Sequence, residues 1–116
     1  MSPRIHPTAF VHADAKLADD VEVGPWAFIG PDCSVAAGGV IQMRATLEAH
    51  VHLAARVTVG IGSVLGGLPQ DLKFKGEVTT VEIGEDTTIR EYVTINRGTS
   101  ESMKTTVGKK RFLMTY

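Results

Sequence analysis

The 116-residue chain is poor in cysteine and in aromatic residues, and it carries almost no net charge. Its single cysteine, Cys33, excludes an internal disulfide and a zinc site built from several cysteines, and it suits a reducing compartment. A formal net charge of −1 argues against binding to nucleic acid or to an anionic membrane surface. No apolar run approaches the roughly 18 residues of a membrane-spanning helix, and no apolar leader follows Met1.

The composition is otherwise that of a single folded domain. A chain of 116 residues is large enough for one domain and too small for two. Apolar residues make up 43% and charged residues 22%, which is far from the composition of disordered chains. Because the chain has 12 glycines and only 6% aromatic residues, we expect a core of small aliphatic side chains.

An aliphatic residue recurs at every sixth position over more than half of the chain. The series is Ile5, Val11, Leu17, Val23, Ile29, Val35, Ile41, Leu47, Leu53, Val59 and Leu65, and it resumes at Ile83, Ile89, Ile95, Val107 and Leu113. A small residue usually stands two places before each of these, as Ala27 does before Ile29. Residues two apart lie on one face of a strand, so each hexad predicts a short strand with both side chains inward.

A repeat of six residues predicts an all-β solenoid. One strand and one corner per hexad, with three hexads to a coil, wind the chain into a three-walled prism whose coils stack at ~4.8 Å. The length then corresponds to about five coils. The glycine that often follows the aliphatic position would let the chain turn each corner without steric penalty. Gly24-Pro25 and Gly30-Pro31 exclude a long helix.

Two polar segments interrupt the hexads, at about residues 66–80 and 98–105. Both contain glycine, and we expect them to project from the wall as loops, which is where solenoids often bind ligands. We therefore predict a single β-helix domain over residues 1–116, with two projecting loops and with a C-terminal end truncated in mid-hexad.

One of the three walls is more apolar and aromatic than the others. Side chains 18 residues apart stack on it, and Trp26 stands beside this stack: Phe10, Phe28, Thr46 and Val64. A stacked apolar patch on a surface indicates a contact with another molecule. We predict an oligomer interface formed by Phe10, Trp26, Phe28 and Val64.

The hexads resemble those of the hexapeptide-repeat proteins, most of which are acyltransferases with a left-handed parallel β-helix fold. Two segments make the resemblance more specific: Pro69-Gln70-Asp71-Leu72-Lys73-Phe74-Lys75-Gly76-Glu77 and Thr94-Ile95-Asn96-Arg97-Gly98-Thr99. At this separation they resemble the UDP-N-acetylglucosamine 3-O-acyltransferases that open lipid A biosynthesis, and the similarity runs from Ile5 to the C-terminus. The left hand is implied by the resemblance alone.

The resemblance implies a cytoplasmic, homotrimeric enzyme that moves a 3-hydroxyacyl group from acyl carrier protein to the 3-hydroxyl of UDP-N-acetylglucosamine. It implies no metal and no organic cofactor, and it implies four substrate-binding residues: Gln70, Asp71, Lys73 and Asn96. Asp71 would accept a hydrogen bond from a substrate hydroxyl, and Lys73 would contact a phosphate. Asn96 would line the same cleft, where relatives often have a histidine.

The family's general-base histidine lies beyond the segment that matches Phe112 to Tyr116. We therefore expect no catalytic residue in this chain and no activity of the chain alone, since acyl transfer to a hydroxyl needs a proton acceptor. The alternative is a non-catalytic, truncated hexapeptide-repeat solenoid that only self-associates. A third possibility is the N-acyltransferase of the same pathway, which carries an extra N-terminal uridine-binding domain, whereas the hexads here begin at Ile5.

The other reactive side chains have structural interpretations. Cys33 stands at the small inward position of its hexad, which predicts a buried, unreactive thiol. The cluster Lys109-Lys110-Arg111 could contact an acidic acyl carrier protein or could be a solvated corner.

The chain has four histidines, and a carbonic anhydrase family uses this same fold to bind zinc. Ligands on adjoining coils should be 18 or 36 residues apart, and no such pair exists among them: His6, His12, His50 and His52. Two of these flank the inward position Val51 and should point outward. We predict no metal site.

Overall fold

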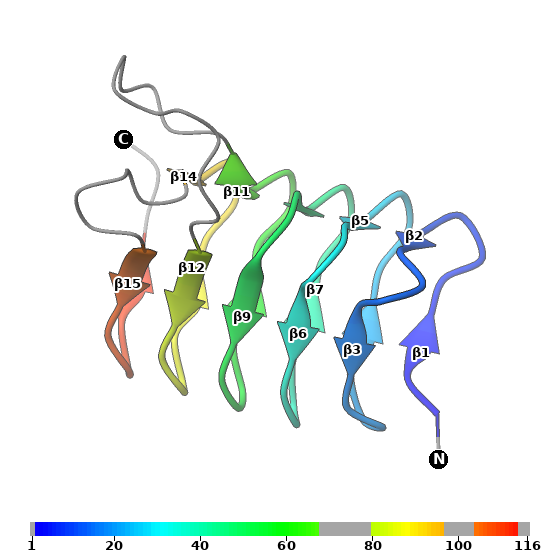
Figure 1. The fold of residues 1–116 in the computed structure, drawn as a ribbon, viewed down its shortest axis with the longest axis horizontal. Coiled ribbons are helices and arrows are strands. Elements are labelled where there is room, and N and C mark those ends of the chain that lie inside the picture. The colour runs from blue at the N-terminus through cyan, green and yellow to red at the C-terminus, as the bar shows by residue number, and fades with distance from the viewer. Residues whose placement is uncertain (1, 68–79, 97–103, 114–116) are drawn as a thin grey trace.

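The computed structural model describes residues 2–67, 80–96 and 104–113. Every regular element in these ranges is a β-strand, and successive strands fall on three walls in turn (Figure 1). We call the walls sheets A, B and C. Sheet A consists of β1 (Arg4–Ile5), β4 (Glu22–Val23), β7 (Val40–Ile41), β10 (Thr58–Val59), β13 (Thr88–Ile89) and β16 (Phe112–Leu113). Sheet B consists of β2 (Phe10–Val11), β5 (Phe28–Ile29), β8 (Thr46–Leu47), β11 (Val64–Gly67) and β14 (Thr94–Asn96). Sheet C consists of β3 (Lys16–Leu17), β6 (Ser34–Val35), β9 (Val51–Leu53), β12 (Thr80–Ile83) and β15 (Lys104–Val107).

The strands stack in parallel and in the register that the hexads predict. Val23 pairs with Ile41, and Ile41 pairs with Val59, so the aliphatic positions lie one above another. Thr58 then pairs with Thr88, which shows that the segment between β11 and β12 adds residues without disturbing the stack. The prediction of a three-walled solenoid of about five coils is confirmed.

The two predicted loops fall mainly on residues outside the described ranges. At their ends, Gly66 and Gly67 close β11, Thr80 opens β12, and Lys104 opens β15. The described part of the chain contains no helix that is long and apolar enough to cross a membrane.

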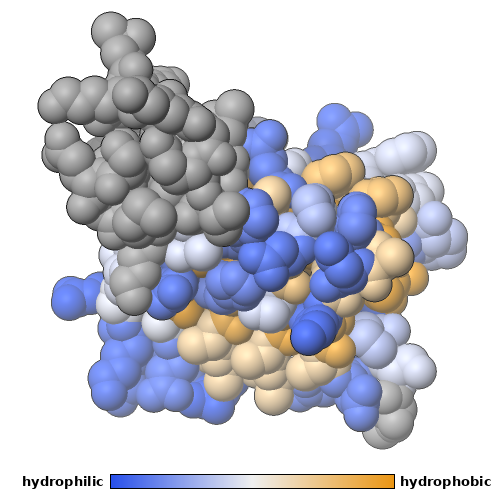
Figure 2. Space-filling model, viewed as in Figure 1, coloured by the Kyte–Doolittle hydropathy of each residue, from blue (hydrophilic) through white to orange (hydrophobic). Residues whose placement is uncertain are grey.

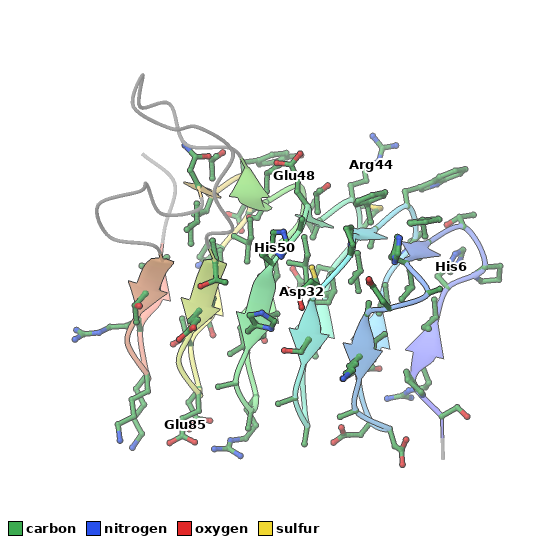
Figure 3. The ribbon with its side chains drawn as sticks, viewed as in Figure 1. His6, Asp32, Arg44, Glu48, His50 and Glu85 are labelled. Carbon is green, nitrogen blue, oxygen red and sulfur yellow. The ribbon has the colours of Figure 1, made fainter. Side chains whose placement is uncertain are left out.

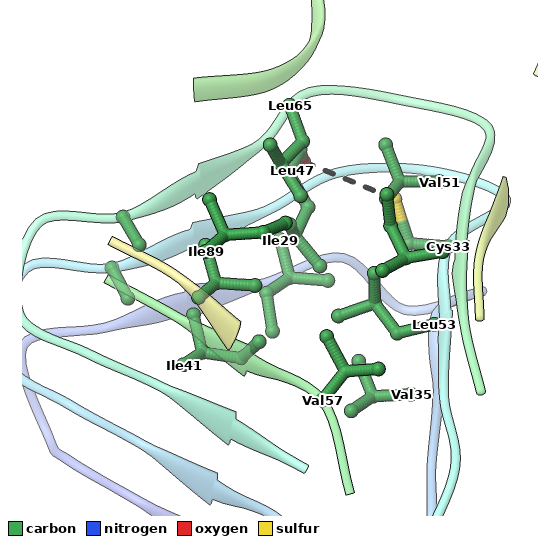
Figure 4. Close-up of a cluster of buried hydrophobic side chains, with 14 of the residues drawn as sticks. Ile29, Cys33, Val35, Ile41, Leu47, Val51, Leu53, Val57, Leu65 and Ile89 are labelled. Atoms are coloured by element: carbon green, nitrogen blue, oxygen red, sulfur yellow. Dashed lines mark hydrogen bonds between the residues drawn. The ribbon is translucent and has the colours of Figure 1, made fainter. Parts of the chain in front are cut away.

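The core is a single column of aliphatic side chains inside the prism (Figure 4). In most two-residue strands the first residue faces outward and the second is buried, as in β5, where Ile29 is fully buried. The small residue two places earlier is buried as well, as the sequence predicts for Ala27 and Cys33. At two of these small inward positions the residue is polar and buried, namely Ser63 and Thr87. The Ser63 hydroxyl donates to the carbonyl of Arg90 and the Thr87 hydroxyl to that of Gly108, both on the next coil.

The corners correct the expected role of glycine. The residue with positive φ at a corner is usually not glycine, as at Trp26, Arg44 and Tyr92. The glycine that follows the aliphatic position is needed instead because the next coil comes too close. A Cβ on Gly30 would lie 1.8 Å from the carbonyl oxygen of Glu48, and one on Gly60 would lie 2.4 Å from the carbonyl carbon of Arg90.

The first coil differs from the others at all three corners. Its corner residues Thr8, Asp14 and Asp20 use side-chain oxygens to accept the N–H of the residue 18 places later, at 2.9, 3.0 and 2.9 Å. In later coils the acceptor is instead a backbone carbonyl. The N–H of Arg44, for example, donates to the carbonyl of Pro25. The polar side chains thus satisfy backbone donors near the N-terminal end of the stack, where they replace carbonyl acceptors.

Candidate functional site

The edge between sheets B and C, which we call the B/C edge, carries an irregularity where β11 ends. Val64 and Leu65 pair with Thr94 and Ile95, but Asn96 then pairs with Gly67, so Gly66 is an extra residue in β11. Gly66 has φ +86°, a conformation that favours glycine. A bulge of this kind ends regular pairing and redirects the chain, and it lies directly before the segment that begins at Leu68.

Three residues from three coils meet at this bulge. A Cβ on Gly67 would lie 3.0 Å from Oδ1 of Asn96 and 3.0 Å from Oε2 of Glu48. The two oxygens are therefore no farther apart than the sum of these distances. Glu48 is exposed and lies beside the end of β11 (Figure 3), while Asn96 is half-buried. The carboxylate accepts hydrogen bonds, and the carboxamide both accepts and donates them.

A column of ionisable groups runs along the same edge on the preceding coils. Asp14, Asp32 and His50 are each 18 residues apart. The backbone N–H of Asp32 donates to Asp14, and this bond, more than any other interaction, lowers the pKa of the Asp14 carboxyl. Asp32 Oδ2 lies 2.7 Å from Nδ1 of His50 and 3.9 Å from Nε2 of His52.

Both of these histidines point outward, as predicted, and both are bonded to the preceding coil. His50 is bonded to Asp32, and Nδ1 of His52 lies 2.7 Å from the Ser34 hydroxyl. Neither bond is directed toward Asn96, which lies on a later coil. Among the described residues, no group of three histidine, cysteine or acidic side chains is placed to hold a metal ion.

The edge between sheets C and A, the C/A edge, carries a separate set of ion pairs. Arg56 donates to Asp86 at 2.6 and 3.1 Å and lies 3.5 Å from Glu85. These bonds lower the pKa of Asp86 and raise that of Arg56. Lys109 and Lys110 lie exposed on this edge, and Lys110 donates its backbone N–H to Glu85. The basic cluster is thus on a different edge from Asn96.

Cys33 lies inside the prism, 2% exposed, as the sequence predicts. Burial raises the pKa of its thiol, so the reactive thiolate is disfavoured. Its Sγ lies 3.9 Å from the carbonyl oxygen of Leu47, the contact drawn in Figure 4.

The outer face of sheet B carries the predicted apolar patch. Phe10, Phe28, Thr46 and Val64 are successive partners in the register. The rings of Phe10 and Phe28 are stacked, with centroids 5.1 Å apart. Trp26, beside them at the corner, is 62% exposed. Figure 2 shows hydrophobic side chains over the N-terminal coils of the face in view.

An apolar groove of about 820 Å³ lies on the sheet A side of the corner that carries Trp26. This corner, the A/B edge, joins sheets A and B. Ile5, Val40, Met43 and Ile61 line the groove, and its polar lining includes Arg4. A smaller groove of about 540 Å³ lies over β9, β12 and β15 on sheet C.

The structure places only one of the four predicted substrate-binding residues. Asn96 is the last residue of β14, at the bulge, whereas Gln70, Asp71 and Lys73 lie outside the described residues. Sequence reasoning missed Glu48. A signal was present in the sequence. The residues 18 positions before and after Glu48 are Gly30 and Gly66, so an acidic residue stands between two glycines at corresponding positions of successive coils.

The fold and the stacked hexads define a class, the left-handed parallel β-helix proteins built from hexapeptide repeats. No family model matches the sequence. Two solved structures superpose on it with a TM-score of 0.92: LpxA, a UDP-N-acetylglucosamine acyltransferase, from Bacteroides fragilis 9343, and LpxA from Acinetobacter baumannii. They are 40% and 33% identical and align with 95% and 96% of this chain, and with 43% of each solved chain. This agreement confirms the expected fold and hand.

Curated relatives are similar over the same span. The acyl-(acyl-carrier-protein)–UDP-N-acetylglucosamine O-acyltransferase of Saccharophagus degradans is 42% identical over 113 residues, 97% of this chain and 44% of that protein. The enzyme of the same name from Azorhizobium caulinodans is 42% identical over 112 residues, 96% of this chain and 41% of its own length. The chain thus spans less than half the length of these relatives. Over nearly its whole length it is similar to part of a UDP-N-acetylglucosamine O-acyltransferase, which confirms the resemblance found in its motifs.

Proposed function

We propose that the chain is the N-terminal part of a cytoplasmic acyltransferase. The enzyme moves a 3-hydroxyacyl group from acyl carrier protein to the 3-hydroxyl of UDP-N-acetylglucosamine, as a step of lipid A biosynthesis. In this proposal the chain supplies contacts to the nucleotide sugar and no catalytic group, and it uses no metal or organic cofactor.

The observation that supports this proposal is the pairing, at the B/C edge, of the last described residue before the first motif segment with a residue of the second. Gly67 pairs with Asn96, and Gln70, Asp71 and Lys73 follow Gly67 within six residues in the sequence. The family's substrate contacts come from the residues that match these four. Lys73 would face a phosphate as a point charge, and Asp71 would accept a hydrogen bond from a sugar hydroxyl.

The proton of the sugar hydroxyl must go to a base during acyl transfer. His50 and His52 are bonded to the coil before them, to Asp32 and Ser34 respectively. We assign neither of them this role. The proposal therefore concerns substrate binding, and binding is the property to test.

Saturation-transfer NMR with UDP-N-acetylglucosamine tests the proposal directly. We expect transfer to the sugar and base protons of the ligand with the wild-type chain. We expect a clear loss of transfer with the double variant Asp71→Ala, Lys73→Ala. Lys16→Ala, on sheet C, is the matched control and should behave as the wild type. Equal signals from all three proteins, or none from the wild type, would contradict the proposal.

We also propose that the chain forms a homotrimer through the A/B edge. The exposed aromatic patch of sheet B and the groove of sheet A are different surfaces on either side of this edge. A contact between two unlike patches is heterologous, and repeated by rotation it closes a ring. In such a ring the patch of one protomer packs on the groove of the next. The non-catalytic alternative, self-association alone, predicts the same ring without nucleotide binding.

Analytical ultracentrifugation of the double variant Phe10→Glu, Phe28→Glu tests the interface. We expect it to sediment as a smaller species than the wild type, because two charges would be buried against an apolar surface. Lys16→Glu, Ser34→Glu changes the corresponding positions of sheet C and should keep the wild-type mass. An unchanged mass for the phenylalanine variant would refute the interface.

A further inference from the structure

Glu48 is an exposed carboxylate with no partner among the described residues. Its side chain makes neither a hydrogen bond nor an ion pair in the ranges that the structure describes, whereas Glu22 pairs with Arg4, and Asp86 with Arg56. Glu48 is therefore not required by the ion-pair network of the fold. No bond within the described ranges explains why a carboxylate stands at this position.

The stack places no side chain directly before or after Glu48 at the corresponding positions of the neighbouring coils. The residues at these positions, 18 before and 18 after Glu48, are Gly30 and Gly66, which have no side chains. On the later coil, a Cβ on Gly67 would approach the Glu48 carboxylate to 3.0 Å. Because Gly67 has no side chain, the side-chain oxygens of Glu48 and Asn96 can both approach one point of the B/C edge.

The chemistry of the pair restricts what it can bind. A carboxylate accepts hydrogen bonds, and the carboxamide of Asn96 adds an acceptor and a donor. A hydroxyl can donate to the carboxylate and accept from the carboxamide N–H, while an amide N–H can donate to the carboxylate. A phosphate cannot, because it has no hydrogen to donate at neutral pH and is repelled by the carboxylate.

We propose that Glu48, together with Asn96, is a specificity site that hydrogen-bonds an uncharged polar group of the sugar in the nucleotide-sugar substrate. This inference rests on the proposed function, and it assigns Glu48 to the sugar and not to the diphosphate. The carboxylate is the acceptor, and a sugar hydroxyl or acetamido N–H is the donor.

Isothermal titration calorimetry with two probes tests this assignment. UDP-N-acetylglucosamine carries the sugar, and UDP lacks it. We expect Glu48→Ala to weaken the binding of UDP-N-acetylglucosamine about tenfold, the usual effect of removing a charged hydrogen-bond partner, and to leave UDP binding unchanged. Glu48→Gln keeps one acceptor oxygen and should weaken the binding of UDP-N-acetylglucosamine by about threefold. Asp19→Asn removes an exposed charge on the C/A edge and should change neither affinity.

The outcomes separate this inference from the proposed function. If the wild-type chain binds UDP-N-acetylglucosamine and Glu48→Ala leaves that affinity unchanged, or shifts both ligands by the same factor, the assignment of Glu48 is overturned and the proposed function stands. If the wild-type chain binds neither ligand, both are overturned. Because Glu48 is exposed and makes no ion pair or hydrogen bond within the described ranges, the variants should keep the circular dichroism spectrum of the wild type.

Discussion

The close approach of neighbouring coils at Gly30 makes a quantitative prediction. An added Cβ would lie 1.8 Å from the carbonyl oxygen and 2.8 Å from the carbonyl carbon of Glu48, and both are backbone atoms. The coils cannot move apart freely, because Gly30 donates to Leu47 at 2.7 Å. We expect Gly30→Ala to lose this bond and to strain the packing, at about 3 kcal/mol of unfolding free energy in total.

Gly38→Ala is the matched comparison. Gly38 has φ +76°, but the atom nearest to an added Cβ is Cγ of the flexible Arg56 side chain, at 3.0 Å. The strain of positive φ costs ~1–2 kcal/mol, and the reduced freedom of the unfolded chain offsets part of it, so we expect a net loss of about 1 kcal/mol.

Urea unfolding, followed by far-ultraviolet circular dichroism at one protein concentration, measures both losses. The fixed concentration matters because self-association adds to apparent stability. Gly30→Ala should unfold at clearly lower urea than Gly38→Ala. If Gly38→Ala is the more damaging change, glycine serves the backbone angle and not the spacing of the coils, and the reasoning is refuted.

Three further predictions concern the core, the thiol and the edge. Leu47→Ala should cost about 3 kcal/mol in a denaturant titration, because the side chain is fully buried; a cost below about 1 kcal/mol would contradict the packing. Cys33 should react with a thiol reagent far more slowly in the native chain than in urea, and equal rates would show that it is accessible. The lowered pKa of Asp14 adds stability above its ordinary value of 3.8, and this stability is lost as the pH falls through the folded-state pKa. Asp14→Asn should therefore be less stable than the wild type at pH 6, with a gap that narrows below about pH 4; a constant gap would refute this.

The sequence predicts the stack of coils because one period determines both the strand and the pairing. Three hexads make a coil, so Val23, Ile41 and Val59 must either all face inward in register or all fail to do so. The hand has no such determinant in the period, and it came from the resemblance. The prediction that glycine serves to turn the corners was wrong for a physical reason. The constraint on Gly30 is its distance to residue 48 on the next coil, which the local sequence does not reveal.

The candidate site was less predictable than the fold. Asn96 came from a motif, but Glu48 lies 48 positions earlier in the sequence and reaches it only because the bulge at Gly66 brings Gly67 opposite Asn96. An exposed carboxylate has no periodicity of its own, so the stacking of three coils had to be known first. The aromatic wall was predictable, because Phe10 and Phe28 are one coil apart and outward-facing positions repeat with the same period as the core.

A crystal structure of the chain with UDP-N-acetylglucosamine tests the central claim most directly. We predict coils stacked in the present register, with the nucleotide sugar bound at the B/C edge and an uncharged group of the sugar within hydrogen-bond distance of Glu48 and Asn96. A nucleotide bound on another edge, or a chain in which the aliphatic positions do not stack, would contradict it.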